Sequence, residues 1–217
     1  MKIAIDGPSG SGKSTIAKLL AKKLGIAYLD TGAMYRAIAY YVLEKGIEPS
    51  DEKGVIQSLE GLKMSVWEEN GVQQVSVNGD NVTPFIRENR ISMAASTVSK
   101  IPAVRIKLVE LQREIASKTD CVLDGRDIGS YVLPDADYKF YLTANSLVRA
   151  KRRQAELAAK GEEHTVEELQ KEMEARDEQD KNRAFAPLTI CNDATVIDTS
   201  FMTIDEVAEN VLKRICG

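Results

Sequence analysis

The sequence predicts an α/β fold: a doubly wound parallel sheet of five strands, with a small inserted antiparallel β lobe and a helical lid. Three observations predict it. Short apolar runs alternate with helix-like stretches, one region between them carries two Asn-Gly turns, and two highly charged helical stretches follow the fourth apolar run. Strands that alternate with helices are typical of parallel sheets covered by helices on both faces.

Five apolar runs are predicted to be buried strands. They are mostly continuous rather than alternating, as expected where helices cover both faces of the sheet. The runs are KIAID (2–6), IAYL (26–29), CVLD (121–124), YKFYL (138–142) and ATVID (194–198).

Each stretch between these runs carries helix start or stop signals. Proline suits a first turn, Thr-x-x-Glu is typical of a capping box, and glycine commonly follows the last helical residue. The helix that begins at Pro102 is expected to reach Val109. The signals are Thr31 and Pro102 as helix starts, Gly25 and Gly46 as helix ends, and the capping boxes Thr165–Glu168 and Thr203–Glu206.

One region interrupts this alternation. Asn70-Gly71 and Asn78-Gly79 separate short β-like runs such as VQQVSV, so the region is predicted to form antiparallel hairpins. It is expected to be a lobe that covers a substrate; the alternative is a surface hairpin without a function. The predicted domains are a core of residues 1–60 and 94–217, which includes a lid at about 149–183, and an inserted acceptor-binding lobe of residues 61–93.

Composition excludes several classes of protein. The 217 residues are 43% hydrophobic and 29% charged, which is ordinary for a globular protein and unlike a disordered chain. The net charge of −4 argues against a general nucleic-acid binder, which needs a basic face. No apolar run is as long as a membrane span, the first residues do not resemble a signal peptide, and the cysteines form no C-x-x-C pair. We therefore expect a cytoplasmic protein that binds neither a nucleic-acid polymer nor a membrane. We also expect a monomer, although composition does not decide the oligomeric state.

A glycine-rich loop follows the first predicted strand. Gly7-x-x-x-x-Gly12-Lys13-Ser14 fits the P-loop pattern and precedes a predicted helix, which is the context that the pattern requires. Lys13 is expected to reach the β- and γ-phosphates of ATP, and Ser14 to bind Mg²⁺. Asp124 is a second candidate for the metal, directly or through water, with a turn or capping role as its alternative. The predicted ATP-binding residues are Gly7, Pro8, Ser9, Gly10, Ser11, Gly12, Lys13, Ser14 and Thr15.

Two features favour a kinase over a GTPase. The N-K-x-D motif that binds guanine is absent, and the single D-x-x-G, which starts at Asp51, follows no strand. Arginines suited to neutralising a transferred phosphoryl group are grouped on two predicted helices joined by AAKGEEHT, a candidate hinged lid. The alternative is a solvated, salt-bridged helix pair. The first helix carries Arg149, Arg152 and Arg153, and the second carries Arg176, Asp180 and Arg183.

The sequence shows no evident general base. The single histidine, His164, is expected at the surface. An alcohol acceptor needs a base to take its proton, whereas a phosphate acceptor arrives as an anion and depends on positioning and electrostatics. These considerations favour a nucleoside monophosphate as the acceptor, with Asp124 left open as a base.

Five stretches together resemble one family, the bacterial cytidylate (CMP) kinases, which are P-loop nucleoside monophosphate kinases. The resemblance runs almost end to end and in order. The stretches are IDGPSGSGKST (5–15), LDTGAMYRA (29–37), AASTVSKIPAVR (94–105), DGRDIGSYVLPDAD (124–137) and RDEQDKNRAFAPL (176–188). Gln179 stands where some relatives carry arginine, which leaves one fewer cation in the lid.

The resemblance implies a P-loop core with a CMP-binding insertion and a lid, and it implies roles for individual residues. It assigns the cytosine ring to Ser96, Arg105 and Asp127, the acceptor phosphate to Arg36, Arg126 and Arg183, and the sugar side to Arg176 and Asp180, with Thr31 lining the same site. The expected catalytic residues are Lys13, Arg126, Arg149, Arg152 and Arg153.

The residue types also suit cytosine, which presents an amine donor beside ring acceptors. Asp127 offers an acceptor and Arg105 a donor, and uracil would leave buried polar groups unpaired. The alternatives are a helix-surface hydroxyl for Ser96 and a turn carboxylate paired with Arg126 for Asp127. The sequence thus predicts a transferase that moves the γ-phosphoryl of ATP·Mg²⁺ to CMP and dCMP. A kinase for another monophosphate or small acceptor, or a nucleotide-dependent switch, is the alternative.

Overall fold

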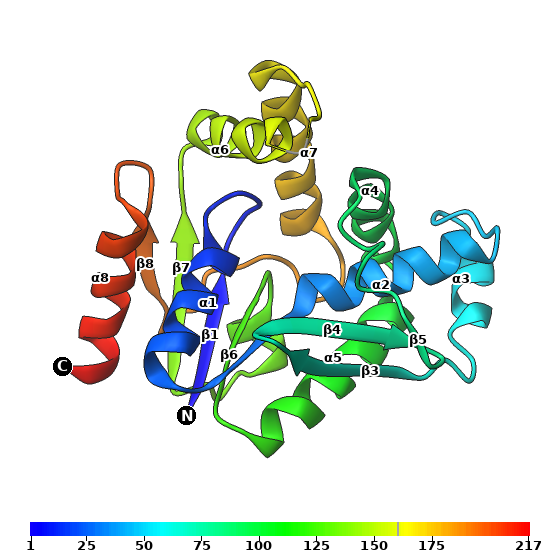
Figure 1. Ribbon diagram of the computed structural model, residues 1–217, viewed down its shortest axis with the longest axis horizontal. Helices are drawn as coiled ribbons and strands as arrows, with labels where there is room; N and C mark the ends of the chain where they lie inside the picture. The colour runs from blue at the N-terminus through cyan, green and yellow to red at the C-terminus, as the bar shows by residue number, and fades with distance from the viewer. Residues whose placement is uncertain (160) are drawn as a thin grey trace. The chain divides into compact units, whose positions relative to one another are not determined.

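The computed structural model has the predicted α/β architecture and describes residues 1–159 and 161–217 (Figure 1). Each predicted strand of the large sheet agrees with the observed strand to within one residue at either end. The large sheet contains β1 (Lys2–Asp6), β2 (Ala27–Asp30), β6 (Cys121–Gly125), β7 (Tyr138–Thr143) and β8 (Thr195–Asp198). The helices are α1 (Lys13–Leu24), α2 (Thr31–Glu44), α3 (Glu52–Ser58), α4 (Asn89–Val98), α5 (Pro102–Lys118), α6 (Ser146–Ala158), α7 (Val166–Asn182) and α8 (Ile204–Cys216).

The large sheet has the spatial order β2-β6-β1-β7-β8. Strand β1 pairs in parallel with both β6 and β7, and β7 pairs in parallel with β8. The register sets Ile5 beside Asp124 and Asp6 beside Gly125. Because successive residues point to opposite faces, Ile5 and Asp124 share one face and Asp6 points to the other. Asp6 and Asp124 thus lie on opposite faces at the carboxyl end of the parallel strands, which is where ligands bind in folds of this kind.

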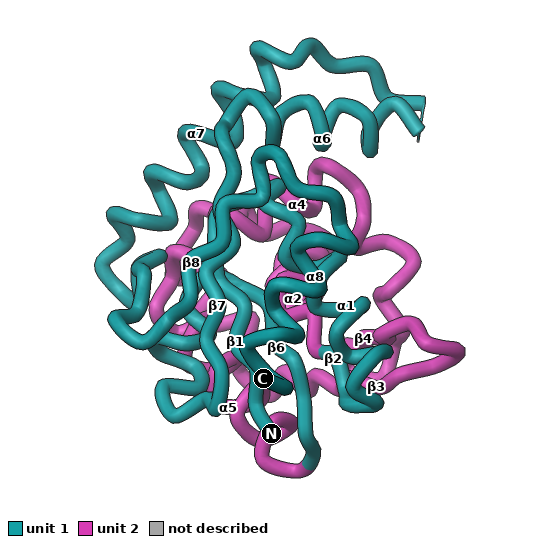
Figure 2. Tube along the Cα trace, turned by 90° about the vertical axis from the view of Figure 1, so that its left-hand side faces the viewer, with its two compact units in different colours: residues 1–28, 119–217 teal, residues 29–118 magenta. Residues whose placement is uncertain are grey.

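The chain forms two compact units, shown in different colours in Figure 2. Unit 1 contains residues 1–28 and 119–217, and unit 2 contains residues 29–118. The inserted lobe predicted at residues 61–93 lies wholly within unit 2, and its identity as a separate acceptor-binding domain stays a prediction.

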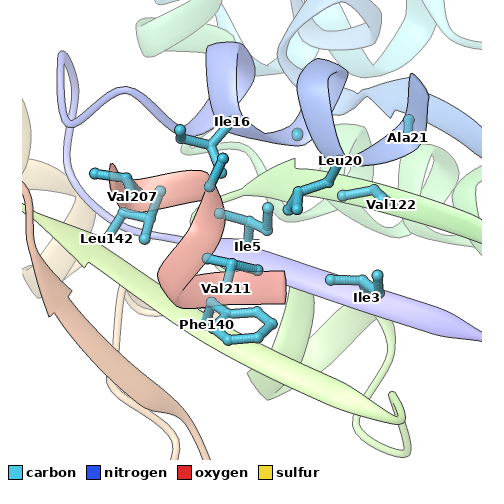
Figure 3. Packing of buried hydrophobic residues seen from close by; sticks show 12 residues of the cluster. Ile3, Ile5, Ile16, Leu20, Ala21, Val122, Phe140, Leu142, Val207 and Val211 are labelled. Atoms are coloured by element: carbon cyan, nitrogen blue, oxygen red, sulfur yellow. The ribbon is translucent and has the colours of Figure 1, made fainter. Parts of the chain in front are cut away.

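Unit 1 has its main core on one face of the sheet. Helices α1 and α8 cover the face that carries Ile3 and Ile5, as Figure 3 shows. The apolar stripe of α1 is buried there, and the helix ends at Gly25, whose φ of 65° is left-handed, as predicted. The buried residues of this core are Ile3, Ile5, Ile16, Ala17, Leu20, Ala21, Val122, Phe140, Leu142, Val207, Ala208 and Val211.

A second apolar cluster of unit 1 joins α6 and α7, which lie side by side in Figure 1. Ala150 and Leu157 of α6 pack with Leu169 and Met173 of α7. The capping box predicted at Thr165 opens α7, and the one predicted at Thr203 opens α8. The charged helix pair of the predicted lid is therefore held together by an apolar seam.

Unit 2 is built around α2, which contacts α4, α5 and β4. Its small antiparallel sheet has the order β3-β4-β5, with β3 at Met64–Glu69, β4 at Val72–Val77 and β5 at Asp80–Asn81. Asn70 and Asn78 have φ values of 53° and 54°, and a glycine with positive φ follows each of them. These are the two predicted Asn-Gly hairpin turns.

Two helix boundaries in unit 2 differ from the prediction. Thr31 is not the N-cap of α2, because the Asp30 carboxylate accepts the Ala33 N–H at 2.8 Å. Aspartate and threonine are both favourable caps, so the sequence alone did not separate the two neighbours. Helix α5 continues to Lys118 rather than ending at Val109. Among the described residues, none of the helices has both the length and the apolar composition needed to cross a bilayer.

Candidate active site

The glycine-rich loop joins β1 to α1 in unit 1. Gly7 has a φ of 145°, and a Cβ atom there would lie 2.0 Å from the Leu142 carbonyl oxygen. Gly12 is the N-cap of α1 with a φ of 89°. Both conformations favour glycine, so the pattern is required by the backbone geometry of the loop. The loop ends at the positive end of a 12-residue helix, where an anion is stabilised.

Lys13 is folded back onto the loop that it follows. Its Nζ donates to the Pro8 carbonyl oxygen at 2.6 Å, and the Ser11 hydroxyl donates to the same oxygen at 3.0 Å. The pKa of Lys13 lies well below its usual value, first because of burial and then because the Arg126 guanidinium repels it. An anion at this loop would stabilise the charged ammonium, which is what a phosphate-binding lysine requires.

Ser14 and Asp124 form the predicted metal-binding pair. The Ser14 hydroxyl donates to Asp124 Oδ2 at 2.7 Å, and the Tyr28 hydroxyl donates to Asp124 Oδ1 at 2.8 Å. A hydroxyl and a carboxylate are hard oxygen donors, which is the chemistry that Mg²⁺ prefers. These residues fit the ion that accompanies a nucleotide.

The loop after β6 and the end of α7 bring four predicted acceptor residues of unit 1 into one charged cluster. Arg126 Nε donates to Asp180 Oδ2 at 2.9 Å. Arg183 Nη2 lies 3.3 Å from Asp127 Oδ1, and its Nη1 lies 3.5 Å from Asp180 Oδ1. Arg176 lies on the same helix as Asp180. The cluster alternates cations and carboxylates, so a ligand phosphate that binds these arginines replaces internal ion pairs.

Asp6 supports this cluster, and the sequence analysis did not identify it. Residues 128–132 form a single π-helical turn, η1, directly after Asp127. The Asp6 carboxylate accepts the N–H groups of Ile128 and Gly129, each at 2.8 Å. Burial raises the pKa of Asp6 to about 6, against the lowering effect of these two hydrogen bonds. The residue just before the P-loop therefore holds the turn that follows Asp127.

The three arginines predicted on α6 make different contacts. Arg149 donates through Nη1 to the Ser9 carbonyl oxygen at 2.9 Å and to Asp177 Oδ2 at 2.5 Å. Arg152 donates to the hydroxyl and the carbonyl oxygen of Thr199, and the Thr199 hydroxyl donates to the Ser11 carbonyl oxygen at 3.2 Å. Two of the three arginines are thus linked to the main chain of the P-loop.

Arg153 pairs with Glu156 of its own helix at 3.3 Å. Its predicted catalytic role, and those of Arg149 and Arg152, stay predictions. Residue 160, within the predicted AAKGEEHT hinge, lies outside the described residues. His164 is part-exposed, as expected, with 32% of its side chain accessible.

In unit 2, Asp30 organises two arginines. Arg36 Nη2 lies 3.0 Å and Arg87 Nη2 lies 3.2 Å from the same atom, Asp30 Oδ2. Gln73 exchanges hydrogen bonds with the main chain of Asp30, which ties β4 to the start of α2. Arg36 and the buried Thr31 were predicted for the acceptor site, whereas Arg87 and Asp30 were not. Arg87 lies outside the five stretches that carry the family resemblance, and Asp30 lies within LDTGAMYRA but was given no role of its own.

The remaining predicted residues of unit 2 lie on α4 and at the start of α5. Arg105 is almost fully buried, with 1% exposed. Its Nη1 donates to the Ser99 carbonyl oxygen at 3.3 Å, and its guanidinium lies 5.4 Å from the centre of the Tyr35 ring. The Ser99 hydroxyl donates to the Ser96 carbonyl oxygen at 2.8 Å. Ser99 thus connects the main chain of Ser96 to Arg105, and the assignment of Ser96 and Arg105 to the cytosine ring stays a prediction.

Comparison with known proteins adds family evidence to this geometry. The sequence matches the family model described as cytidylate kinase over residues 3–216. It is 49% identical over 213 residues to the cytidylate kinase of Clostridioides difficile, across 98% of this chain and 97% of that relative. It is 44% identical over 215 residues to the cytidylate kinase of Lactiplantibacillus plantarum, across 99% of this chain and 94% of that relative.

A solved structure is similar to this chain at the level of the fold. It is the crystal structure of an uncharacterized protein from Eubacterium ventriosum, with a TM-score of 0.55 and 17% identity. The match covers 99% of this chain and 97% of that protein. At this identity the likeness supports the fold alone.

Proposed function

The chain belongs to the cytidylate kinase family, and we propose that it transfers the γ-phosphoryl group of ATP to CMP and to dCMP, giving ADP and CDP or dCDP. The observation that carries the proposal is a P-loop whose Ser14 hydroxyl is bonded to Asp124, in a chain that matches the family over residues 3–216. We further propose that the enzyme works as a cytoplasmic monomer.

For the donor nucleotide, the proposal assigns the phosphates of ATP to the main-chain N–H groups of the loop from Gly7 to Thr15. Lys13 neutralises the β- and γ-phosphates, and its lowered pKa returns toward the usual range when those anions bind. Ser14 and Asp124 hold the magnesium ion, which supplies further neutralisation of phosphate charge.

For the acceptor base, the proposal assigns opposite hydrogen-bonding roles to Asp127 and Arg105. Asp127 accepts from the exocyclic amine of cytosine, and Arg105 and Ser96 complete the recognition of the ring. Both Asp127 and Arg105 are buried, so an analogue with the wrong polarity leaves a buried group unpaired. Uracil is such an analogue, because a carbonyl replaces the amine.

For the acceptor phosphate and sugar, the proposal assigns roles to both units. Arg36, Arg126 and Arg183 bind the phosphate, Arg176 and Asp180 the sugar hydroxyls, and Thr31 lines the same site. The ion pairs of these arginines with carboxylates support this assignment, because they hold each guanidinium in place before a phosphate arrives.

For the transfer step, the proposal assigns charge neutralisation to Lys13, Arg126, Arg149, Arg152 and Arg153. The lid, residues 149–183, excludes water when it closes over bound nucleotides. The acceptor phosphate is already an anion, so no strong base is needed, and positioning supplies most of the rate.

The test is a panel of acceptors offered with ATP and Mg²⁺: CMP, dCMP, UMP, AMP and shikimate. We expect CMP and dCMP to have the highest kcat/KM, and UMP to be poorer by about 100-fold or more. Faster turnover of UMP, AMP or shikimate than of CMP would overturn the choice of acceptor. Slow ATP hydrolysis with no phosphorylated acceptor would indicate a switch instead.

A further inference from the structure

The peptide of Ser9, in the middle of the P-loop, is held on both sides by a buried ion pair from the helices of the predicted lid. The Ser9 N–H donates to Asp177 Oδ1 at 3.1 Å, and the Ser9 carbonyl oxygen accepts from Arg149 Nη1 at 2.9 Å. The same Arg149 nitrogen lies 2.5 Å from Asp177 Oδ2. Asp177 has no role in the function proposed above.

Packing around this peptide leaves the loop little freedom. A Cβ atom on Gly10 would lie 2.6 Å from Met173 Cε and 3.2 Å from Arg149 Cβ. Met173 belongs to the apolar seam between α6 and α7. Arg149 is anchored further by a bond from its Nε to the Ala144 carbonyl oxygen at 3.0 Å. The loop therefore rests against a helix pair that is itself firmly packed.

Helix α7 carries two buried aspartates that serve different neighbours. Asp177 contacts the P-loop, whereas Asp180, three residues later, contacts Arg126 and Arg183. Each aspartate is 5% exposed. The two residues have the same chemistry, burial and helix, and they differ in whether they face the donor loop or the predicted acceptor residues.

We propose that Asp177 is a positioning residue for the donor nucleotide. Together with Arg149 it fixes the orientation of the Ser9 peptide, and through it the curvature of the loop whose N–H groups receive the phosphates of ATP. The pair is neutral overall, so it shapes the loop without repelling phosphate. Asp177 also orients Arg149 toward the loop. This inference rests on the proposed use of ATP as donor, and it is independent of the identity of the acceptor.

A purely structural role makes a different prediction. A buried ion pair is weak evidence for stability, since well-packed apolar side chains of similar volume often serve as well. If the pair only filled space, apolar replacements would preserve ATP binding. If it positions the Ser9 peptide, the hydrogen bonds to that peptide are required, and apolar replacements lose them.

The first experiment compares Asp177→Asn with Asp180→Asn. Binding of ATP and Mg²⁺ is measured by calorimetry without an acceptor, and KM for CMP is measured separately. We expect Asp177→Asn to weaken ATP binding about 10-fold, since small displacements of a binding loop carry large costs. We expect Asp180→Asn to change ATP affinity less than about twofold while raising KM for CMP. Equal ATP affinity in the two variants would overturn the proposal.

The second experiment keeps the proposal falsifiable if Asp177→Asn does not fold. The double variant Arg149→Met with Asp177→Leu removes both charges together, so no uncompensated charge is left buried. We expect a folded protein by thermal denaturation whose ATP affinity is still about 10-fold lower. Wild-type ATP affinity in this folded variant would show that the Arg149–Asp177 ion pair has only a structural role, and it would overturn the proposal. A CMP-inactive wild type with these same ATP results would refute the acceptor and leave the role of Asp177 intact.

Discussion

The two units present different kinds of group to an anion. In unit 1, the P-loop offers main-chain N–H groups, while side chains occupy the carbonyl oxygens of Pro8, Ser9 and Ser11. In unit 2, the groups on offer are guanidinium side chains, and Arg36 is already paired with Asp30. A phosphate at the P-loop uses main-chain donors that the loop and the side chains packed on it hold in place, whereas a phosphate at Arg36 competes with a carboxylate for a side-chain donor.

The two sites therefore depend on different properties: the P-loop on the shape of its backbone, and the arginine site on its balance of charges. The P-loop depends on the backbone conformations of its glycines, so it is sensitive to changes in the loop and its supports. The arginine site depends on the balance between ligand and internal carboxylates, so it is sensitive to changes of charge. A substitution that weakens the use of ATP or of CMP, but not of both, supports this comparison. A substitution that weakens the use of both nucleotides equally contradicts it.

The largest effect is expected for Lys13→Ala, which removes the cation of the donor loop. We expect kcat to fall about 1,000-fold, because the lysine stabilises charge on the transferred group. The thermal midpoint should stay the same or rise, since burial lowers the Lys13 pKa and makes its charge costly without a phosphate. Steady-state kinetics and thermal denaturation measure the two quantities.

Lys22→Ala is the matched control for this variant, because Lys22 is an exposed lysine on the same helix. We expect its kcat to stay within about twofold of wild type, as for a surface substitution away from the site. If Lys13→Ala kept a tenth of the activity, the assigned role of the donor loop would be wrong.

A smaller effect, confined to the acceptor, is expected for Arg105→Met in unit 2. Methionine fills much of the volume beside Tyr35 and donates no hydrogen bond. We expect kcat/KM for CMP to fall about 100-fold, as for a lost charged hydrogen bond, while KM for ATP is unchanged. Arg113→Met, at an exposed position of the same helix, is the control. Equal losses for CMP and ATP would refute a base-reading role.

Asp6→Asn tests the support under the turn after Asp127 through its effect on stability. The pKa of Asp6 is raised from 3.8 to about 6 in the folded chain, so folding favours the protonated acid. Its contribution to stability is complete below pH 3.8 and is lost as the pH rises through about 6. As the pH rises from about 4 to 8, the wild type loses this contribution and Asp6→Asn does not. We therefore expect the free energy of unfolding of Asp6→Asn to rise by about 2–3 kcal/mol relative to that of wild type across this range.

Urea unfolding of both proteins across this pH range measures that difference. The wild-type curve alone is insufficient, because carboxylates with lowered pKa, such as Asp193 and Asp198, shift stability in the opposite direction. A constant difference between Asp6→Asn and wild type at every pH would show that Asp6 titrates normally.

Local signals made most of the fold predictable. Continuous apolar runs predicted the strands of the large sheet, and Asn-Gly pairs predicted the hairpin turns. The turn η1 was not predicted, because its geometry depends on Asp6, which lies 122 and 123 residues away from its two partners. The N-cap of α2 was assigned to the wrong one of two favourable neighbours. These two errors arose where distant partners or near-equal local choices decide the structure.

The candidate site divides in the same way. The P-loop was predictable because the glycines, lysine and serine of its pattern lie within eight consecutive residues, 7–14. The roles of Arg105 and Asp127 came from the resemblance to a family, supported by the chemistry of cytosine. Asp177 was missed because its partner Ser9 lies 168 residues away, and no local pattern links the two. Arg87 was missed for the same reason.

The smallest effect is expected for Ala186→Gly, in a strained loop of unit 1. Its comparison is with a relaxed hairpin turn of unit 2. Ala186 has a φ of 48°, and its carbonyl oxygen accepts Arg183 Nε at 2.6 Å. A backbone with this φ disfavours alanine, and glycine relieves the strain. Glycine also loses more conformational entropy on folding, so we expect the free energy of unfolding to rise by only about 0.5–1 kcal/mol. Asn70→Gly is the control, with a smaller gain, because asparagine tolerates a φ of 53°. Equal gains in urea unfolding would show that Ala186 carries no extra strain, and the Arg183 loop would then be as relaxed as the hairpin.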